Sequence, residues 1–154
     1  MRHPSERVCQ RVLELAREAF DAGETPVGAA LVDIHGNIVA DGRNRIVEDS
    51  DPSAHAELLA IRQACKVTNS ERLPELILIS SLEPCLMCSG LIIHARIPEI
   101  AFMAASQWPG LRHYLEKFSD SINHRPAWRI LDAYEDSASN LLTRFFQDRR
   151  KPTV

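Results

Sequence analysis

A continuous apolar run, Leu-Ile-Leu-Ile-Ser at residues 76–80, most constrains the fold of this chain. The run has the length of a β-strand, and it shows no alternation between apolar and polar residues before Ser80. Runs of this kind are typical of strands that are buried on both faces. A strand buried on both faces needs helices on either side of its sheet. The run therefore predicts a sheet that is covered on both sides.

The segments around this run alternate between helical and strand patterns. Strands are also expected over residues 27–34, 38–44 and 100–104, and His35-Gly36-Asn37 predicts a hairpin turn between the first two. Helices are expected over residues 5–22, 54–66, 85–95 and 136–150. Residues 106–129 show no clear pattern, and we expect a loop there with a short helix over 111–118. The chain is expected to be one domain over residues 1–154, an α/β three-layer α-β-α sandwich with a mixed central sheet of about five strands.

Charge and composition set limits on partners and location. The chain has a formal net charge of −3, so it lacks the excess of basic residues that strong non-specific binding to nucleic acid usually needs. The first residues show no apolar run of signal-peptide type, and no segment approaches the roughly 18 to 20 apolar residues of a membrane span. We therefore expect a cytoplasmic protein without a membrane partner.

Three residues form a candidate metal site. Cys85 and Cys88 are one helical turn apart at the start of an expected helix, so both sulfurs can point to the same side. In a reducing compartment such a pair indicates metal binding or catalysis before it indicates a disulfide. His55, at the start of the preceding expected helix, adds an imidazole, and a His/Cys/Cys set suits zinc. We expect one Zn²⁺ per chain, with the fourth tetrahedral position left to water as in catalytic zinc sites.

The other two cysteines decide whether such a site is closed. Cys65 lies ten residues after His55 on the same expected helix, about 15 Å further along its axis, which is too far for a shared metal ion. Cys9 is not excluded by this argument, although a small buried side chain on the first helix is the alternative interpretation of it. A non-catalytic protein with a structural zinc site, closed by Cys9, therefore remains an alternative hypothesis.

Glu57 is the expected catalytic residue and proton carrier. Within a regular helix the side chains of His55 and Glu57 would point about 200° apart. We therefore predict that His55 precedes the regular part of its helix and that Glu57 reaches back over the metal. In that position Glu57 can take a proton from water, deliver it to a ring nitrogen and protonate departing ammonia.

Four segments carry a resemblance to a known family: residues 25–29 (TPVGA), 42–45 (GRNR), 51–57 (DPSAHAE) and 82–90 (LEPCLMCSG). With them the chain resembles the zinc-dependent cytidine and deoxycytidylate deaminase superfamily. It is most similar to the branch of tRNA-specific adenosine deaminases, guanine deaminases and fungal-type cytosine deaminases. The resemblance implies His55, Cys85 and Cys88 as zinc ligands, Glu57 as proton shuttle, and a homodimer with a partner loop near the pocket. It also implies that Asn44 hydrogen-bonds the base or its sugar, while the sequence equally allows a turn residue at the end of a strand.

Two substrates are compatible with this chemistry. The main hypothesis is a small free nucleobase or related amino-heterocycle, which loses an exocyclic amine as ammonia; the alternative is adenosine in a tRNA anticodon loop. Residues 141–150 are similar to the last helix of tRNA adenosine deaminases. Residues 104–110 (AASQWPG) lack the Ala-Arg-Asp-x-Lys-x-Gly pattern of those enzymes, and together with the acidic balance they favour the free base. Asn44, Ala56 and Trp108 are the expected substrate contacts; Trp108 would stack on a base, or would instead pack its loop onto the core.

Overall fold

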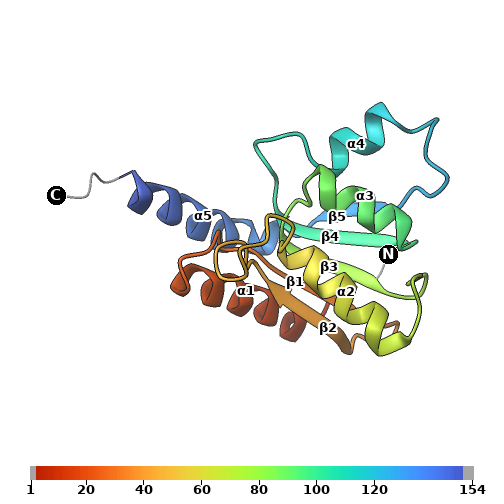
Figure 1. The fold of residues 1–154 in the computed structure, drawn as a ribbon, viewed down its shortest axis with the longest axis horizontal. Coiled ribbons are helices and arrows are strands. Elements are labelled where there is room, and N and C mark those ends of the chain that lie inside the picture. The colour runs from red at the N-terminus through yellow and green to blue at the C-terminus, as the bar shows by residue number, and fades with distance from the viewer. Residues whose placement is uncertain (1–2, 151–154) are drawn as a thin grey trace.

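Residues 77–80 of the apolar run lie in β3 (Ile77–Leu82), the central strand of a five-stranded sheet with the order β2-β1-β3-β4-β5, and Leu76 directly precedes this strand. We describe residues 3–150 in a computed structural model of the chain (Figure 1). The strand β1 (Gly28–Val32) is antiparallel to both β2 (Ile38–Arg43) and β3. The strands β3, β4 (Glu99–Ala104) and β5 (Ala127–Ile130) are parallel to one another. The expected mixed sheet of about five strands is confirmed.

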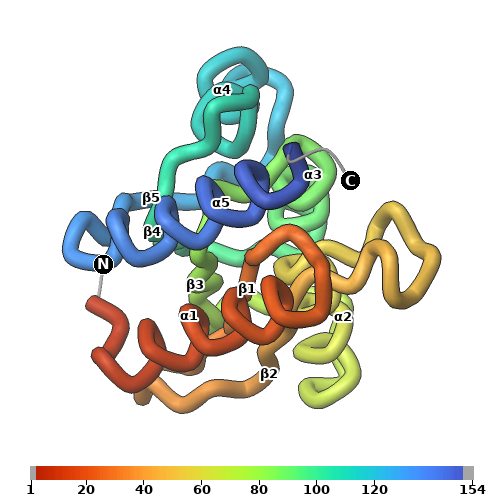
Figure 2. The backbone as a smooth tube through the Cα atoms, turned by 90° about the vertical axis from the view of Figure 1, so that its left-hand side faces the viewer, coloured from red at the N-terminus to blue at the C-terminus, as the bar shows by residue number. Residues whose placement is uncertain are grey.

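Helices cover both faces of this sheet, as the buried central strand predicts. On one face α1 (Glu6–Asp21) packs beside α5 (Glu135–Arg149), which follows a short 3-10 turn, η1 (Asp132–Tyr134); Figure 2 shows the two helices side by side. The other face carries α2 (Ala56–Thr68), α3 (Leu86–His94) and α4 (Leu111–Lys117). The α/β fold with three layers is therefore confirmed.

A hydrophobic core lies on each face of the sheet, and successive residues of a strand point alternately into one core and the other. Leu31, Leu78 and Phe102 face α2 and α3, whereas Ala30 and Ile79 face α1 and α5. Successive side chains of a strand point to opposite faces, so a sheet between two apolar cores requires apolar residues at every position. This requirement explains the unbroken apolar run of β3. None of the helices among residues 3–150 is long and apolar enough to cross a membrane.

The segment 106–129 was predicted to be a loop with one short helix, and this prediction needs correction. The short helix is present as α4, but the segment also contains most of β5. This strand lies at the edge of the sheet and is half-exposed, so its Ala-Trp-Arg-Ile sequence shows neither a continuous apolar run nor a clear alternation. The expected domain covers residues 1–154, and residues 1–2 and 151–154 lie outside the described part of the chain.

Candidate metal centre and active site

The three predicted ligands meet at the amino ends of two helices. His55 and Cys85 are the N-cap residues of α2 and α3, each with an extended backbone conformation (φ −74°, ψ 149° and φ −69°, ψ 174°). Cys88 lies in the first turn of α3 and is fully buried. Their ligand atoms all lie within 4.8 Å of one another, and no other group of three or more such residues was found among the described residues. The prediction that His55 precedes the regular part of its helix is confirmed.

The spacing of these atoms fits a tetrahedral zinc ion. The His55 Nδ1 atom lies 3.5 Å from the Cys85 Sγ atom and 3.7 Å from the Cys88 Sγ atom. With zinc–sulfur bonds of about 2.3 Å and zinc–nitrogen bonds of about 2.0–2.1 Å, tetrahedral angles place nitrogen and sulfur about 3.6 Å apart. One imidazole and two thiols at this separation are therefore the right donor set in the right geometry for Zn²⁺.

The surroundings of the site favour negatively charged sulfur. The Cys88 thiol donates a hydrogen bond to the Cys85 sulfur, and this bond, together with one from His55, lowers the pKa of Cys85 to about 4 against the opposing effect of burial. The same contact with Cys85, followed by burial, raises the pKa of Cys88. The hydrogen bond with Cys85 also raises the pKa of His55. The N-termini of α2 and α3 add the positive ends of two helix dipoles, which favour thiolate and bound metal.

Glu57 lies in the first turn of α2, and its side chain is directed toward the ligand cluster. The residue is only 3% exposed, and burial raises the pKa of its carboxyl group to about 7. The carboxyl group is hydrogen-bonded to the Cys88 thiol and to the Glu57 backbone N–H, and its charge interacts with Cys85 and His55. The prediction that Glu57 reaches back toward the metal ligands agrees with this geometry.

The three expected substrate contacts lie in different surroundings. Asn44 is buried at the end of β2, and its side-chain oxygen accepts a hydrogen bond of 3.2 Å from the backbone N–H of Ala56. Ala56 is fully buried, and this bond engages its N–H group. Trp108 is 81% exposed in the loop after β4. Asn44 and Ala56 are thus part of the helix start that carries His55, whereas Trp108 lies on the surface and does not pack onto the core.

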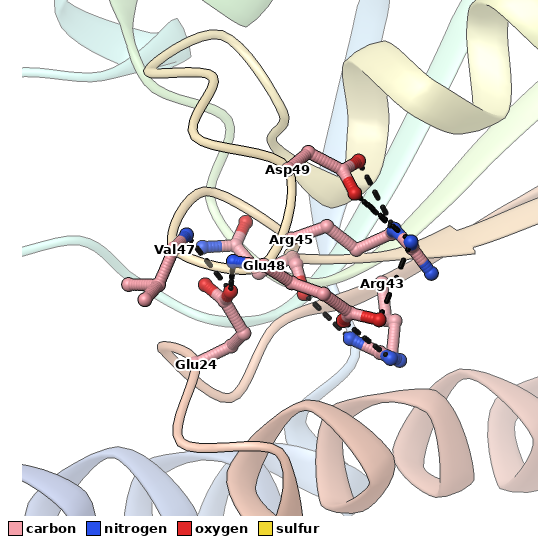
Figure 3. Close-up of polar contacts among 7 residues, drawn as sticks. Glu24, Arg43, Arg45, Val47, Glu48 and Asp49 are labelled. Atoms are coloured by element: carbon pink, nitrogen blue, oxygen red, sulfur yellow. Dashed lines mark hydrogen bonds and ion pairs between the residues drawn. The ribbon is translucent and has the colours of Figure 1, made fainter.

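Sequence analysis did not anticipate the buried carboxylate of Glu24. It accepts hydrogen bonds of 2.8 Å from the backbone N–H groups of both Val47 and Glu48 (Figure 3). These two residues belong to the segment that connects β2 to α2 and therefore lies between Asn44 and His55. Glu24 thus holds this segment from the side of α1.

Ion pairs support the same segment from its solvent side. Arg45 forms a bidentate ion pair with Asp49, in which Nη2 lies 2.9 Å from Oδ1 and Nε lies 3.0 Å from Oδ2 (Figure 3). Arg43 forms a second ion pair with Glu48 at 2.8 Å. Solvent screens ion pairs of this kind at the surface, so each contributes little to stability. Both arginines already have acidic partners, so they do not form an unpaired basic patch.

A second buried acid, Glu83, was also missed as a functional candidate. Its side chain is 2% exposed, and it lies two residues before Cys85. An acidic residue between a buried strand and a proline is the only local signal for this position. Its partners come from residues 106–112, the region whose sequence pattern was unclear.

Cys9 does not complete the metal site. It is fully buried in the core beneath α1, with Val8 and Val12, and its thiol is hydrogen-bonded to Tyr134. It is not part of the group formed by His55, Cys85 and Cys88. The alternative hypothesis of a structural zinc site closed by Cys9 is therefore wrong.

Zinc-dependent nucleobase deaminases combine a His/Cys/Cys metal site with a glutamate that is not a ligand. The fold and the site place the chain in this class of hydrolytic enzymes. Residues 2–104 match the cytidine and deoxycytidylate deaminase zinc-binding region, and the chain belongs to this family.

Relatives within the family extend the similarity over the rest of the chain. The tRNA-specific adenosine deaminase of Haemophilus influenzae is 37% identical over 147 residues, which cover 95% of this chain and 85% of that protein. A guanine deaminase of Bacillus subtilis is 46% identical over 101 residues, which cover 65% of this chain and 64% of that protein. A solved structure from biochemical and structural studies of A-to-I editing by tRNA:A34 deaminases has a TM-score of 0.83 and 34% identity, and the match covers 90% of this chain and all of that one.

These relatives correct the expected substrate. tRNA-specific adenosine deaminases from five bacteria are 33–39% identical to the chain over 88–95% of its length. The main hypothesis of a small free nucleobase is therefore wrong, and the findings favour the tRNA alternative. The whole-chain charge was a misleading guide because net charge does not describe the surface at one site.

Proposed function

We propose that the protein is a tRNA-specific adenosine deaminase that converts adenosine to inosine in an anticodon loop. The observation that carries this proposal is the extent of the similarity. In sequence alignments, five tRNA-specific relatives align over 88–95% of the chain and therefore beyond the metal-binding region, whereas the guanine deaminase aligns over 65%. A guanine deaminase structure of Bacillus subtilis aligns over the whole chain, but with a TM-score of 0.63 against 0.83 for the structure from the tRNA:A34 deaminase studies.

The chemistry follows from the residues at the site. The reaction breaks the bond between C6 and the exocyclic nitrogen of adenine, forms a bond between C6 and a water oxygen, and releases ammonia. When bound by His55, Cys85 and Cys88, zinc supplies activation of water near neutral pH. The Glu57 carboxylate would accept a proton, deliver it to the adjacent ring nitrogen and then protonate the departing amine. The buried position of Glu57 beside Cys88 supports this role.

Asn44 would orient the nucleoside. Its side-chain oxygen is engaged by the Ala56 N–H, so the amide nitrogen is the group left to donate to the base or its sugar. Ala56 would then contribute by holding Asn44 in this orientation, since its N–H group is already used.

A cavity at the carboxyl ends of β3 and β4 supports a substrate larger than one base. Its volume is about 400 Å³, and it lies between Leu82 at the end of β3, the loop Ala104–Trp108, and Phe146 and Arg150 near the end of α5. Trp108 and Phe146 are both exposed aromatic side chains, and stacking of a base on such a ring contributes about 1–3 kcal/mol. Among residues 3–150, no acidic side chain lines the cavity, and Arg150 supplies positive charge for a phosphate. A neighbouring nucleotide of an RNA loop would fit this composition.

We also propose that the enzyme is a homodimer, as the resemblance to the family implies. Leu86 and Met87, between the two cysteine ligands, are 46% and 40% exposed. Exposed apolar side chains that cluster in this way are typical of interaction surfaces. Sedimentation should give twice the mass of one chain, and a monomer at micromolar concentration would contradict the proposal.

The decisive experiment incubates the zinc-loaded protein with a tRNA transcript that has adenosine at the first anticodon position. Mass spectrometry should detect inosine in the wild-type reaction. Glu57→Gln should keep one zinc ion and the wild-type melting temperature while the rate falls by about 10²–10⁴-fold. Ammonia release from free guanine or adenine in the absence of tRNA deamination would refute the proposal, and an active Glu57→Gln variant would remove Glu57 from the mechanism.

A further inference from the structure

The loop that carries Trp108 is joined to the metal-ligand segment through one buried carboxylate. The backbone N–H of Ser106 donates to the Oε2 atom of Glu83 at 3.1 Å, and the backbone N–H of Arg112 donates to its Oε1 atom at 3.0 Å. Ser106 and Arg112 are the two ends of a segment, residues 106–112, that we call the Trp108 loop. A single side chain therefore closes this loop at both ends.

The charge of Glu83 is balanced by the same loop. The Arg112 guanidinium donates from Nε at 3.1 Å and from Nη2 at 2.9 Å to the Oε2 atom of Glu83. Glu83 is 2% exposed, whereas the Arg112 side chain is 39% exposed and lies 5.9 Å from the centre of the Trp128 ring. A buried carboxylate is stable only when it is paired and hydrogen-bonded. All of these hydrogen bonds to the Glu83 carboxylate come from the Trp108 loop. The burial of the carboxylate therefore depends on the loop, and the position of the loop depends on the carboxylate.

Backbone contacts bring the loop directly against the first cysteine ligand. The Leu111 N–H donates to the Pro84 carbonyl at 2.9 Å, and Cys85 pairs with Gly110 as an isolated β-bridge. A Cβ atom on Gly110 would lie 2.8 Å from the Pro84 oxygen and 3.1 Å from the Glu83 Oε1 atom. Glycine at this position is what allows the approach.

We propose that Glu83 is a positioning residue that fixes the Trp108 loop relative to the metal-ligand segment and thereby sets the affinity for the nucleotide substrate. It acts through the loop: Ser106 and Trp108 line the cavity at the carboxyl ends of β3 and β4, and the Ser106 hydroxyl accepts a hydrogen bond of 3.1 Å from the Trp108 backbone N–H. The role in affinity rests on the proposed function, whereas the role in holding the loop does not.

Glu83→Gln tests the proposal without a change of shape. The backbone and guanidinium groups that contact the two carboxylate oxygens are all donors, so the amide NH₂ group of glutamine must face a donor in either orientation. In the zinc-loaded variant, hydrogen exchange at the Ser106 amide or at the Arg112 amide should accelerate at least about tenfold, because the NH₂ group replaces the oxygen that one of these amides donates to. The KM for tRNA should rise at least about tenfold, with kcat changed by less than about threefold and with one zinc ion retained per chain.

Two further variants make the test specific. Arg112→Ala removes the guanidinium but keeps both backbone bonds to Glu83, so its effects should have the same direction and be smaller. Trp108→Ala should raise KM in the wild-type protein but add little in the Glu83→Gln background, because coupled residues are not additive. Asp41→Asn is the matched control: Asp41 is half-buried and accepts a hydrogen bond of 2.8 Å from Arg11, but it lies on β2 and contacts α1 rather than the Trp108 loop.

Each outcome decides for or against the proposal. Wild-type exchange at the loop amides of Glu83→Gln, loss of zinc from that variant, or independent effects of Glu83→Gln and Trp108→Ala on KM would overturn it. If Glu83→Gln does not fold, unchanged loop exchange in Arg112→Ala overturns it. If the wild-type protein does not deaminate tRNA, the proposed function fails, and the loop exchange still decides whether Glu83 positions the loop.

Discussion

The contact between α1 and β1 at Gly28 allows a quantitative prediction. A Cβ atom at this position would lie 2.3 Å from the Val12 oxygen, 2.7 Å from the Leu15 Cβ atom and 2.9 Å from the Ala16 nitrogen. These are atoms at or next to the α1 backbone, so they cannot rotate away, and Gly28→Ala must displace the helix by roughly 1 Å. Overpacking of this kind costs about 1–3 kcal/mol, and the severe overlap places Gly28→Ala near 3 kcal/mol.

Thermal unfolding measures this cost. For a domain of about 150 residues each kcal/mol shifts the melting temperature by about 2–4 °C, so Gly28→Ala should melt about 6–12 °C below the wild type. Gly90→Ala in α3 is the control, because no atom lies within 4 Å of its Cβ position. Alanine stabilises a helix interior by about 0.5–1 kcal/mol relative to glycine, so Gly90→Ala should melt slightly higher than the wild type. A melting temperature of Gly28→Ala within 2 °C of the wild type would refute the reasoning.

Three other predictions concern the metal centre. Cys88→Ala removes one of three ligands, and elemental analysis should find the zinc content reduced from one ion per chain to near zero; retained stoichiometric zinc would exclude Cys88 as a ligand. A chelator should abolish activity and lower the melting temperature by roughly 5–11 °C, since a ligand at 100 times its Kd stabilises by about 2.7 kcal/mol; unfolding that is insensitive to chelator would argue against a bound ion. Gly42→Ala places a Cβ atom 3.0 Å from the Ala56 oxygen and 3.1 Å from the Ala60 nitrogen, so α2 must shift and kcat should fall at least about tenfold; wild-type kcat would show that the start of α2 tolerates this displacement.

The sequence predicted the features that depend on local pattern. The central strand, the flanking helices and the His/Cys/Cys set follow from periodicity and spacing, and His55 could be placed before its helix because a regular helix separates it from Glu57. The strand β5 could not be found in this way, because an edge strand of only four residues, all exposed or half-buried, carries little periodicity. The burial of Glu24 and Glu83 was also not predictable, since each carboxylate is stabilised by amide groups more than 20 residues away.

The substrate was the weakest inference because it depends on surfaces rather than on patterns. A formal charge of −3 predicted weak RNA binding. In the structure, Arg43 and Arg45 are paired with acidic neighbours, whereas Arg150 lines a cavity that has no acidic side chain among the described residues. Such local differences arise only when distant segments are brought together. No count of charges along a chain contains them.

Because Glu83 holds the Trp108 loop at both ends, the middle of the loop can change its sequence, and this bears on how the enzyme could change its substrate preference. The ends of the loop are tied to the framework through Ser106 and Arg112, but Gln107, Trp108 and Pro109 between them are exposed. If the loop contacts the substrate as proposed, substitutions at these three positions would alter which base is accepted without disturbing the metal ligands. Selection, in nature or in a directed library, can explore new substrates there while the hydrolytic apparatus stays intact.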